Sequence, residues 1–254
     1  METIKKPDFI IIGAQKCGTS TMFRNLNKHP DIFLPRKKEL HFFDEKYEKG
    51  IGRYFRYFNR KKIPQTPFCT GEASPFYFFH PLAASRIHQH LPDIKLILLL
   101  RNPINRAYSQ YHHQRRKDRI SISFENAIFL EPQILKNRKD AYFDEENNSD
   151  LIYRRFSFLA RSRYAEQLAV WYQYFRKEQI MIIKSEDYFY NSNATFQQVF
   201  QFLGLPPFEI IPSKEHKTSD YPPMKQETRI QLQAYFEPFN QQLYELTGRD
   251  FEWV

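Results

Sequence analysis

The feature that most constrains the fold is a short apolar run near the start of the chain that ends at a glycine. Residues Phe9–Ile12 are all large and apolar, and Gly13 follows them directly. Such a run is typical of a strand that is buried on both faces. The next segment, Thr19–His29, has Met22 and Leu26 at helical spacing. A strand, a glycine-containing loop and a helix in this order form the opening of a βαβ unit.

Later segments repeat this alternation of strand and helix. Further strands are expected at Phe68–Thr70, Ile94–Leu100 and Ile180–Ile183, and helices at Pro81–Leu91, Pro103–Arg116, Tyr164–Tyr174, Asn193–Leu203 and Lys225–Leu246. Asn102 is a favoured N-cap and Pro103 a favoured first helical residue. The pattern predicts a three-layer α/β fold whose central, mainly parallel sheet is flanked by helices. Because no linker rich in glycine or serine divides the chain, a single domain over residues 1–254 is expected.

Composition narrows the class of partner. The 254 residues include 38 Lys+Arg and 29 Asp+Glu, which gives a formal net charge of +9. This balance favours an anionic partner, such as nucleic acid, an acidic membrane surface or a phosphorylated or sulfated small molecule. Two cysteines are too few for a disulfide framework or a zinc ribbon. The N-terminal segment lacks the pattern of a secretory signal, and the later apolar runs are strand-sized, so a cytoplasmic protein without a membrane anchor is expected.

The loop between the first strand and the first helix predicts an anion site. Backbone N–H groups in such a turn converge at the positive end of the helix dipole. Lys16 adds a full charge, and Thr19–Thr21 adds three hydroxyl groups. Gly13 and Gly18 have the spacing of a Walker A loop, but Thr19 occupies the position of the Walker lysine. A site for a tetrahedral anion is therefore favoured over an ATPase, because an ATPase needs that lysine.

A second candidate anchor follows the longest predicted strand. Arg101 comes directly after Ile94–Leu100, and Ser109 lies about two helical turns further on. Ligands of open parallel sheets bind at the carboxyl ends of the strands, so one ligand with two separated anionic groups could contact the first loop and Arg101. The alternative is that Arg101 only caps or forms an ion pair and that Ser109 is solvated.

Three segments together resemble one enzyme family. The segments are FIIIGAQKCGTSTMFRNLNKHP, LILLLRNPINRAYSQYHH and KKELHFFD, which is Lys37–Asp44. They resemble the 5′-phosphosulfate loop, the 3′-phosphate motif and a Lys-Glu-x-His-Phe-Phe segment of sulfotransferases that use 3′-phosphoadenosine 5′-phosphosulfate (PAPS). The similarity is to the heparan sulfate sulfotransferase branch and its bacterial relatives. It implies a P-loop-like α/β fold, no catalytic metal, and adenosine 3′,5′-bisphosphate (PAP) as the product.

The resemblance also implies roles for single residues. It assigns the 5′-phosphosulfate to Lys16, Cys17, Gly18, Thr19, Ser20 and Thr21. It assigns the 3′-phosphate to Arg101 and Ser109, and a late closing loop to Lys217, Thr218 and Tyr221. Glu39 falls at the position of the general base, with His41 beside it, and Lys16 would stabilise the leaving phosphate. Read without the family, Glu39 is a solvated glutamate next to the charged run Arg36–Lys38.

The chain departs from the family pattern in three places. Where the branch often has a lysine after a glutamate, the sequence around Glu72 has Ala73 instead. A second catalytic cation is therefore not expected at that position. The late loop lacks the usual Gly-Arg pair, and neither cysteine lies where the animal enzymes form their late disulfide.

The acceptor cannot be read from the residues beyond a hydroxyl or amine of a carbohydrate or a small natural product. Two other classes of function are possible: a P-loop kinase or NTPase that uses ATP, and a nucleic-acid-binding module. The position of Lys16 argues against the first class. No recognised nucleic-acid motif supports the second, so neither nucleic acid nor a membrane is expected as a partner. The oligomeric state is left open.

Overall fold

The computed structural model describes residues 5–59, 68–136, 151–211 and 221–253. The chain divides into two compact units. The first, here called the sheet unit, comprises residues 1–100 and 170–216, and the second, the helical unit, comprises residues 101–169 and 217–254. The expectation of a single domain over 1–254 stays a prediction.

The sheet unit contains a parallel sheet of four strands. They are β1 (Phe9–Gly13), β2 (Gly71–Ala73), β3 (Lys95–Leu100) and β4 (Ile180–Lys184), in the order β2-β1-β3-β4. Every neighbouring pair is parallel. β1 and β2 are buried along their whole length, and β3 along all but its first residue. Burial on both faces explains why these strands are apolar runs with little alternation.

The sequence placed the second strand too early. The expectation was Phe68–Thr70, whereas β2 begins at Gly71, and Cys69 forms only an isolated bridge with Ile32. Gly71 is required by a close approach to β1, because a Cβ atom there would lie 2.5 Å from the backbone oxygen of Phe9. A glycine in a sequence usually indicates the boundary of a strand, so the strand was expected to end before Gly71 and not to begin there.

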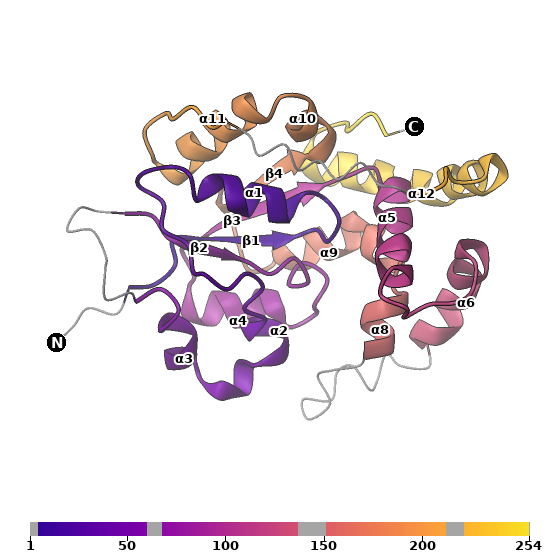
Figure 1. Cartoon of the computed structure of the whole chain (residues 1–254), viewed down its shortest axis with the longest axis horizontal. Helices are drawn as coiled ribbons and strands as arrows, with labels where there is room; N and C mark the ends of the chain where they lie inside the picture. The colour runs from indigo at the N-terminus through magenta and orange to yellow at the C-terminus, as the bar shows by residue number, and fades with distance from the viewer. Residues whose placement is uncertain (1–4, 60–67, 137–150, 212–220, 254) are drawn as a thin grey trace. The chain divides into compact units, whose positions relative to one another are not determined.

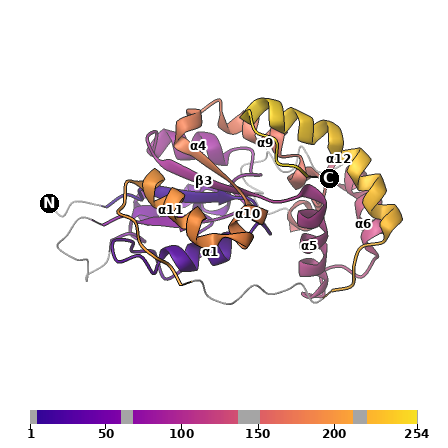
Figure 2. The same cartoon turned by 90° about the horizontal axis from the view of Figure 1, so that it is seen from above.

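Helices cover both faces of the sheet. In the sheet unit they are α1 (Thr19–Leu26), α2 (Phe42–Glu45), α3 (Ile51–Phe55), α4 (Ala83–His90), α10 (Ser185–Tyr190) and α11 (Ser192–Leu203), with short 3-10 turns at η1 (Tyr47–Lys49) and η4 (Lys177–Gln179). In Figures 1 and 2, α1, α10 and α11 lie on one face and α4 on the other. The arrangement confirms the predicted α/β fold with a central parallel sheet.

The helical unit holds the elements that follow β3. They are α5 (Pro103–Arg115), α6 (Phe124–Lys136), α8 (Leu151–Phe156), η3 (Ala160–Ser162) and α12 (Gln226–Thr247), and α9 (Tyr164–Trp171) runs across the boundary of the two units. α5 begins as predicted, because the Asn102 side chain accepts hydrogen bonds from the N–H groups of Ile104 and Asn105, each at 3.1 Å.

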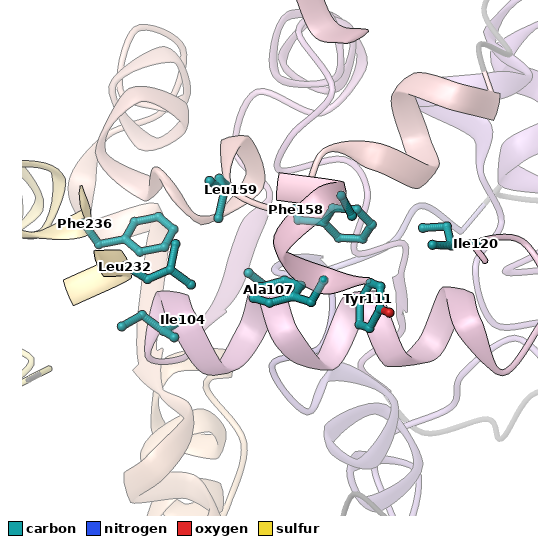
Figure 3. Packing of buried hydrophobic residues seen from close by; sticks show 10 residues of the cluster. Ile104, Ala107, Tyr111, Ile120, Phe158, Leu159, Leu232 and Phe236 are labelled. Atoms are coloured by element: carbon teal, nitrogen blue, oxygen red, sulfur yellow. The ribbon is translucent and has the colours of Figure 1, made fainter. Parts of the chain in front are cut away.

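One apolar cluster forms the core of the helical unit (Figure 3). α5 contributes Ile104, Ala107 and Tyr111, which follow one another along one side of the helix. Phe158 and Leu232 pack against this side from the segment before η3 and from α12. The spacing of three and four residues on α5 is the pattern that buries one stripe of a helix. α5 therefore supplies the hydrophobic stripe on which the rest of this unit packs.

Candidate active site

The loop after β1 is anchored to the neighbouring strand and to α10. The Ala14 N–H donates to the Leu99 oxygen at 2.8 Å, and the Ser185 hydroxyl donates to the Cys17 oxygen at 2.9 Å. Cys17 is fully buried, and its thiol lies 3.9 Å from the Gln15 oxygen. These contacts hold the loop at the carboxyl end of the central strands.

Two residues of this loop have a left-handed backbone. Lys16 has φ of 73° and Gly18 has φ of 93°. Glycine adopts this conformation at little cost, whereas a lysine is strained in it. A Cβ atom on Gly18 would also lie 2.8 Å from Cε1 of Phe189. The loop therefore depends on glycine at position 18 and stores strain at position 16.

The N-terminus of α1 suits an anion. Gly18 provides no side-chain cap, and the first turn of α1 contains no acidic residue. The first N–H groups of a helix have no partner within the helix, and its dipole places about +0.5 of a charge there. Thr19 is buried, Thr21 is half-buried and Ser20 is exposed. The assignment of the phosphosulfate group to these residues, which the family resemblance implies, stays a prediction.

The second part of the site is a chain of polar contacts centred on His41, at the start of α2. Nε2 of His41 lies 3.1 Å from Oε2 of Glu39, and Nδ1 lies 2.7 Å from Oδ2 of Asp44. Nζ of Lys38 donates to Oε1 of Glu39 at 2.9 Å. With a carboxylate at each ring nitrogen, the imidazolium form of His41 donates to both. Residues Glu39–Asp44 are called the base segment from here on.

The surroundings of Glu39 keep it ionised. Its partial burial raises the pKa, but the hydrogen bond with His41 and the charge of Lys38 outweigh burial and lower the pKa to about 2. The side chain keeps 41% of its surface exposed, which leaves it accessible to an acceptor. The interpretation of Glu39 as a plain solvated glutamate misses these two partners.

The base segment is hydrogen-bonded to β2 and so is linked to the loop after β1, residues 14–18, which is called the anion loop. The Glu39 N–H donates to the Ala73 oxygen at 3.1 Å. Ala73 pairs with Ile11 of β1, the strand from which the loop leaves. Glu39 and His41 both have a left-handed backbone, with φ of 61° and 50°. Within the sheet unit, the loop therefore leaves β1 at the edge where the base segment is hydrogen-bonded to the end of the neighbouring strand β2.

The same residues offer ligand atoms for a cation. His41, Asp44 and Glu45 have such atoms within 4.8 Å of one another. Nδ1 of His41 and Oδ2 of Asp44, however, already lie at hydrogen-bond distance from each other. We therefore interpret the cluster as a hydrogen-bonded array.

The remaining predicted residues belong to the helical unit. The Arg101 oxygen accepts a hydrogen bond from the Tyr164 hydroxyl at 2.8 Å, and Ser109 is buried on α5. The Tyr221 ring stacks on the His112 ring, with centroids 4.1 Å apart and planes 3° from parallel. Lys217 and Thr218 lie outside the described residues.

Sequence reasoning missed two acidic groups of this site. Asp44 follows His41 by three residues within the segment Lys37–Asp44, so its spacing was available in the sequence as a signal. Glu72 appeared only as the neighbour of the missing lysine, but its side chain is fully buried and hydrogen-bonded near the base segment. Through Ser74 and Tyr77 it is linked to His41 and Phe42, which lie 33 and 35 residues from those two hydroxyl residues, and no local pattern indicates this link.

Comparison with known proteins defines the class. Residues 6–242 match the family described as "Sulfotransferase domain", and the chain belongs to this family. It is 30% identical over 97% of its length to the membrane-associated sulfotransferase kil1 of Dictyostelium discoideum, of which it covers 66%. It is also 30% identical over 97% of its length to heparan sulfate glucosamine 3-O-sulfotransferase 5 of Mus musculus, of which it covers 74%.

A solved structure agrees with the same assignment. A sulfotransferase from Alicyclobacillus acidocaldarius superposes with a TM-score of 0.80 and 30% identity, covering 98% of each chain. The family consists of PAPS-dependent enzymes, so the expected enzyme class and fold are confirmed. Within the described residues, no helix is long and apolar enough to span a bilayer. A cytoplasmic location stays a prediction.

Proposed function

We propose that this chain transfers the sulfuryl group of PAPS to a hydroxyl or amine of a carbohydrate or small natural product. Glu39 accepts the proton of the acceptor, and Lys16 stabilises the leaving phosphate. The observation that carries this proposal is the array Glu39–His41–Asp44, held beside the anion loop by the bond from Glu39 to Ala73.

The state of Glu39 indicates when the proton moves. A carboxylate with a pKa of about 2 is a weak base toward a free hydroxyl group. The acceptor becomes more acidic as its oxygen or nitrogen bonds to sulfur and the bond between sulfur and the phosphate oxygen breaks. Glu39 therefore takes the proton during transfer and not before it. His41 keeps the carboxylate oriented, and Asp44 keeps His41 oriented.

The anion loop serves the other end of the transfer. Negative charge builds on the bridging oxygen of the leaving phosphate, and donors already aimed at that charge lower the barrier. In this proposal, Lys16 and the N-terminus of α1 supply these donors. The motif alone assigns Arg101 and Ser109 to the 3′-phosphate. It assigns Tyr221, with Lys217 and Thr218 outside the described residues, to a late loop that closes over the nucleotide.

The test begins with the nucleotide. Calorimetric titration of the full chain with PAP should show binding, and titration with Mg-ATP should not. Lys16→Ala and Arg101→Ala should each weaken PAP binding. Binding of Mg-ATP without binding of PAP would support the alternative of a P-loop kinase or NTPase and overturn the proposal.

The acceptor is then found with labelled PAPS. The names of the relatives favour a saccharide hydroxyl as the first class to test, followed by phenols and amines. Glu39→Gln should lower the turnover with any acceptor so identified by ~10²–10⁴ while it leaves PAP binding intact. An unchanged turnover would remove Glu39 as the base.

A further inference from the structure

Glu72 is a buried carboxylate that the proposed reaction does not use. It lies in the middle of β2 with 1% of its surface exposed. Its Oε1 atom accepts hydrogen bonds from the hydroxyl groups of Tyr77 at 2.9 Å and Tyr54 at 3.2 Å. Its Oε2 atom accepts one from the Ser74 hydroxyl at 2.7 Å. A buried carboxylate is costly, so three hydroxyl donors on one side chain mark a built network.

Two of these hydroxyl groups continue to the base segment. The Ser74 oxygen accepts the His41 N–H at 3.2 Å, and the Tyr77 oxygen accepts the Phe42 N–H at 2.9 Å. These N–H groups lie at the start of α2, where His41 has its left-handed backbone. Each hydroxyl has one proton and two lone pairs. Because the proton is given to Glu72, the lone pairs face the two N–H groups.

From these contacts, we infer that Glu72 is a positioning residue that acts through Ser74 and Tyr77 to hold the backbone of His41 and Phe42, and with it the ring that orients Glu39. The catalytic meaning of this role rests on the proposed function. The hydrogen-bond network itself does not depend on any ligand.

The network requires the ionised carboxylate. A protonated Glu72 has an O–H group of its own, and when that group donates to the Ser74 or Tyr77 oxygen it competes there with a backbone N–H. The groups that face Glu72 are Tyr54 from α3, Tyr77 after β2, and Asp44 and His41 at α2. Burial raises the pKa of Glu72 to about 7, although the Ser74 and Tyr77 hydrogen bonds oppose the shift. The base segment should therefore be held more firmly above pH 7 than below it.

The test observes His41 directly and without a ligand. The full chain is labelled with ¹⁵N-histidine, and the backbone N–H signal of His41, the group that donates to Ser74, is followed from pH 5.5 to 8.5 in the wild type, Glu72→Gln and Ser74→Ala. In the wild type this signal should show an inflection near pH 7, and the inflection should be lost in Glu72→Gln. Ser74→Ala keeps the carboxylate but breaks its link to His41, so it should weaken the same inflection.

Two further variants complete the design. Tyr54→Phe removes a hydroxyl group that donates to Glu72 and that, within the described residues, makes no hydrogen bond with the base segment, so this variant should keep the inflection. The double variant Glu72→Gln/Ser74→Ala should resemble Glu72→Gln, because loss of the carboxylate already removes the titrating group that both paths share. His41 signals in Glu72→Gln and Ser74→Ala that follow the wild-type titration would overturn the inference. If circular dichroism shows that Glu72→Gln does not fold, the His41 titration in Ser74→Ala is the test of the inference.

PAP titration separates this inference from the proposed function. PAP should bind the wild type and Glu72→Gln with the same Kd, because Glu72 acts on the base segment and not on the anion loop. Loss of PAP binding in Glu72→Gln alone would contradict this separation of roles. Absence of PAP binding in the wild type would refute the proposed function. The His41 titration would still test the positioning role of Glu72, because it needs no ligand.

Discussion

Oδ2 of the buried Asp44 lies 2.7 Å from Nδ1 of His41, and this contact fixes the ring whose other nitrogen meets Glu39. Asp44→Asn keeps the shape but removes the charge that holds the imidazolium. We expect turnover to fall at least ~10-fold, since small misplacements of a reacting group cost up to ~10² in rate. The measurement is kcat with the acceptor from the screen, alongside the Kd of PAP, which should not change.

Glu45 offers a matched control for Asp44. Its Oε1 atom lies 3.9 Å from the same Nδ1 atom, beyond hydrogen-bond distance. Glu45→Gln therefore removes a nearby charge without removing the contact and should lose less than half of the turnover. Equal losses in the two variants would show that charge near His41 matters and the hydrogen bond does not.

The backbone strain at Lys16 predicts a difference in stability between Lys16→Gly and Lys16→Ala, which both lack the lysine charge. Lys16 has φ of 73°, which glycine adopts freely and alanine does not. Lys16→Gly should be more stable than Lys16→Ala by about 1 kcal/mol, while both lose sulfuryl transfer. Thermal unfolding compares their stability, and PAP binding with turnover compares their function. Recovery of turnover in Lys16→Gly would show that the strain and not the ammonium group serves the reaction.

Gly18 has a positive φ and a side chain packed close to it. Gly248 also has a positive φ but has no close neighbour within the described residues. A Cβ atom would lie 2.8 Å from Phe189 at position 18, whereas nothing lies within 4 Å at position 248, where φ is 67°. Both changes to alanine incur the backbone cost of about 1 kcal/mol. Gly18→Ala should cost about 1–3 kcal/mol more because the Phe189 ring must move. Urea unfolding measures both, and equal losses would contradict the close approach.

The sequence predicted the larger elements well because their signals are local. The apolar run Phe9–Ile12 became β1, and Asn102 caps α5 as expected. α11 and α12 are capped at their C-terminal ends by Gly204 and Gly248, and both glycines have the left-handed conformation. Short helices such as α2, with four residues, are too brief to show a hydrophobic period and were not predicted.

The site was predicted only in part, for a related reason. Lys16 and Glu39 were found by motif, but motifs do not report backbone angles, and the positive φ of Glu39 and His41 has no glycine to signal it. The link from Ser74 to His41 spans 33 residues of sequence. A hydroxyl, a carboxylate and a backbone N–H that meet across such a distance depend on the register of β2, which the sequence placed three residues too early.

A second buried carboxylate, Glu131 of α6, predicts a purely structural effect in the helical unit. Its side chain is 2% exposed and accepts three backbone N–H groups, from Phe158 at 3.0 Å and from Leu159 and Ala160 at 2.8 Å each. This carboxylate therefore satisfies the start of the turn that leads into η3. In Glu131→Gln an amide group faces one of these donors, which leaves a buried N–H without its acceptor.

The expected cost of Glu131→Gln is ~1–3 kcal/mol, the penalty for one unsatisfied buried donor. In a chain of this size that lowers the Tm by about 2–12 °C, measured by calorimetry. Glu166→Gln is the control, because Glu166 keeps 47% of its side chain exposed and pairs with Arg163 at 3.3 Å, an interaction worth at most ~1 kcal/mol. A similar decrease in Tm for both variants would mean that the three N–H groups find other acceptors when Glu131 is replaced.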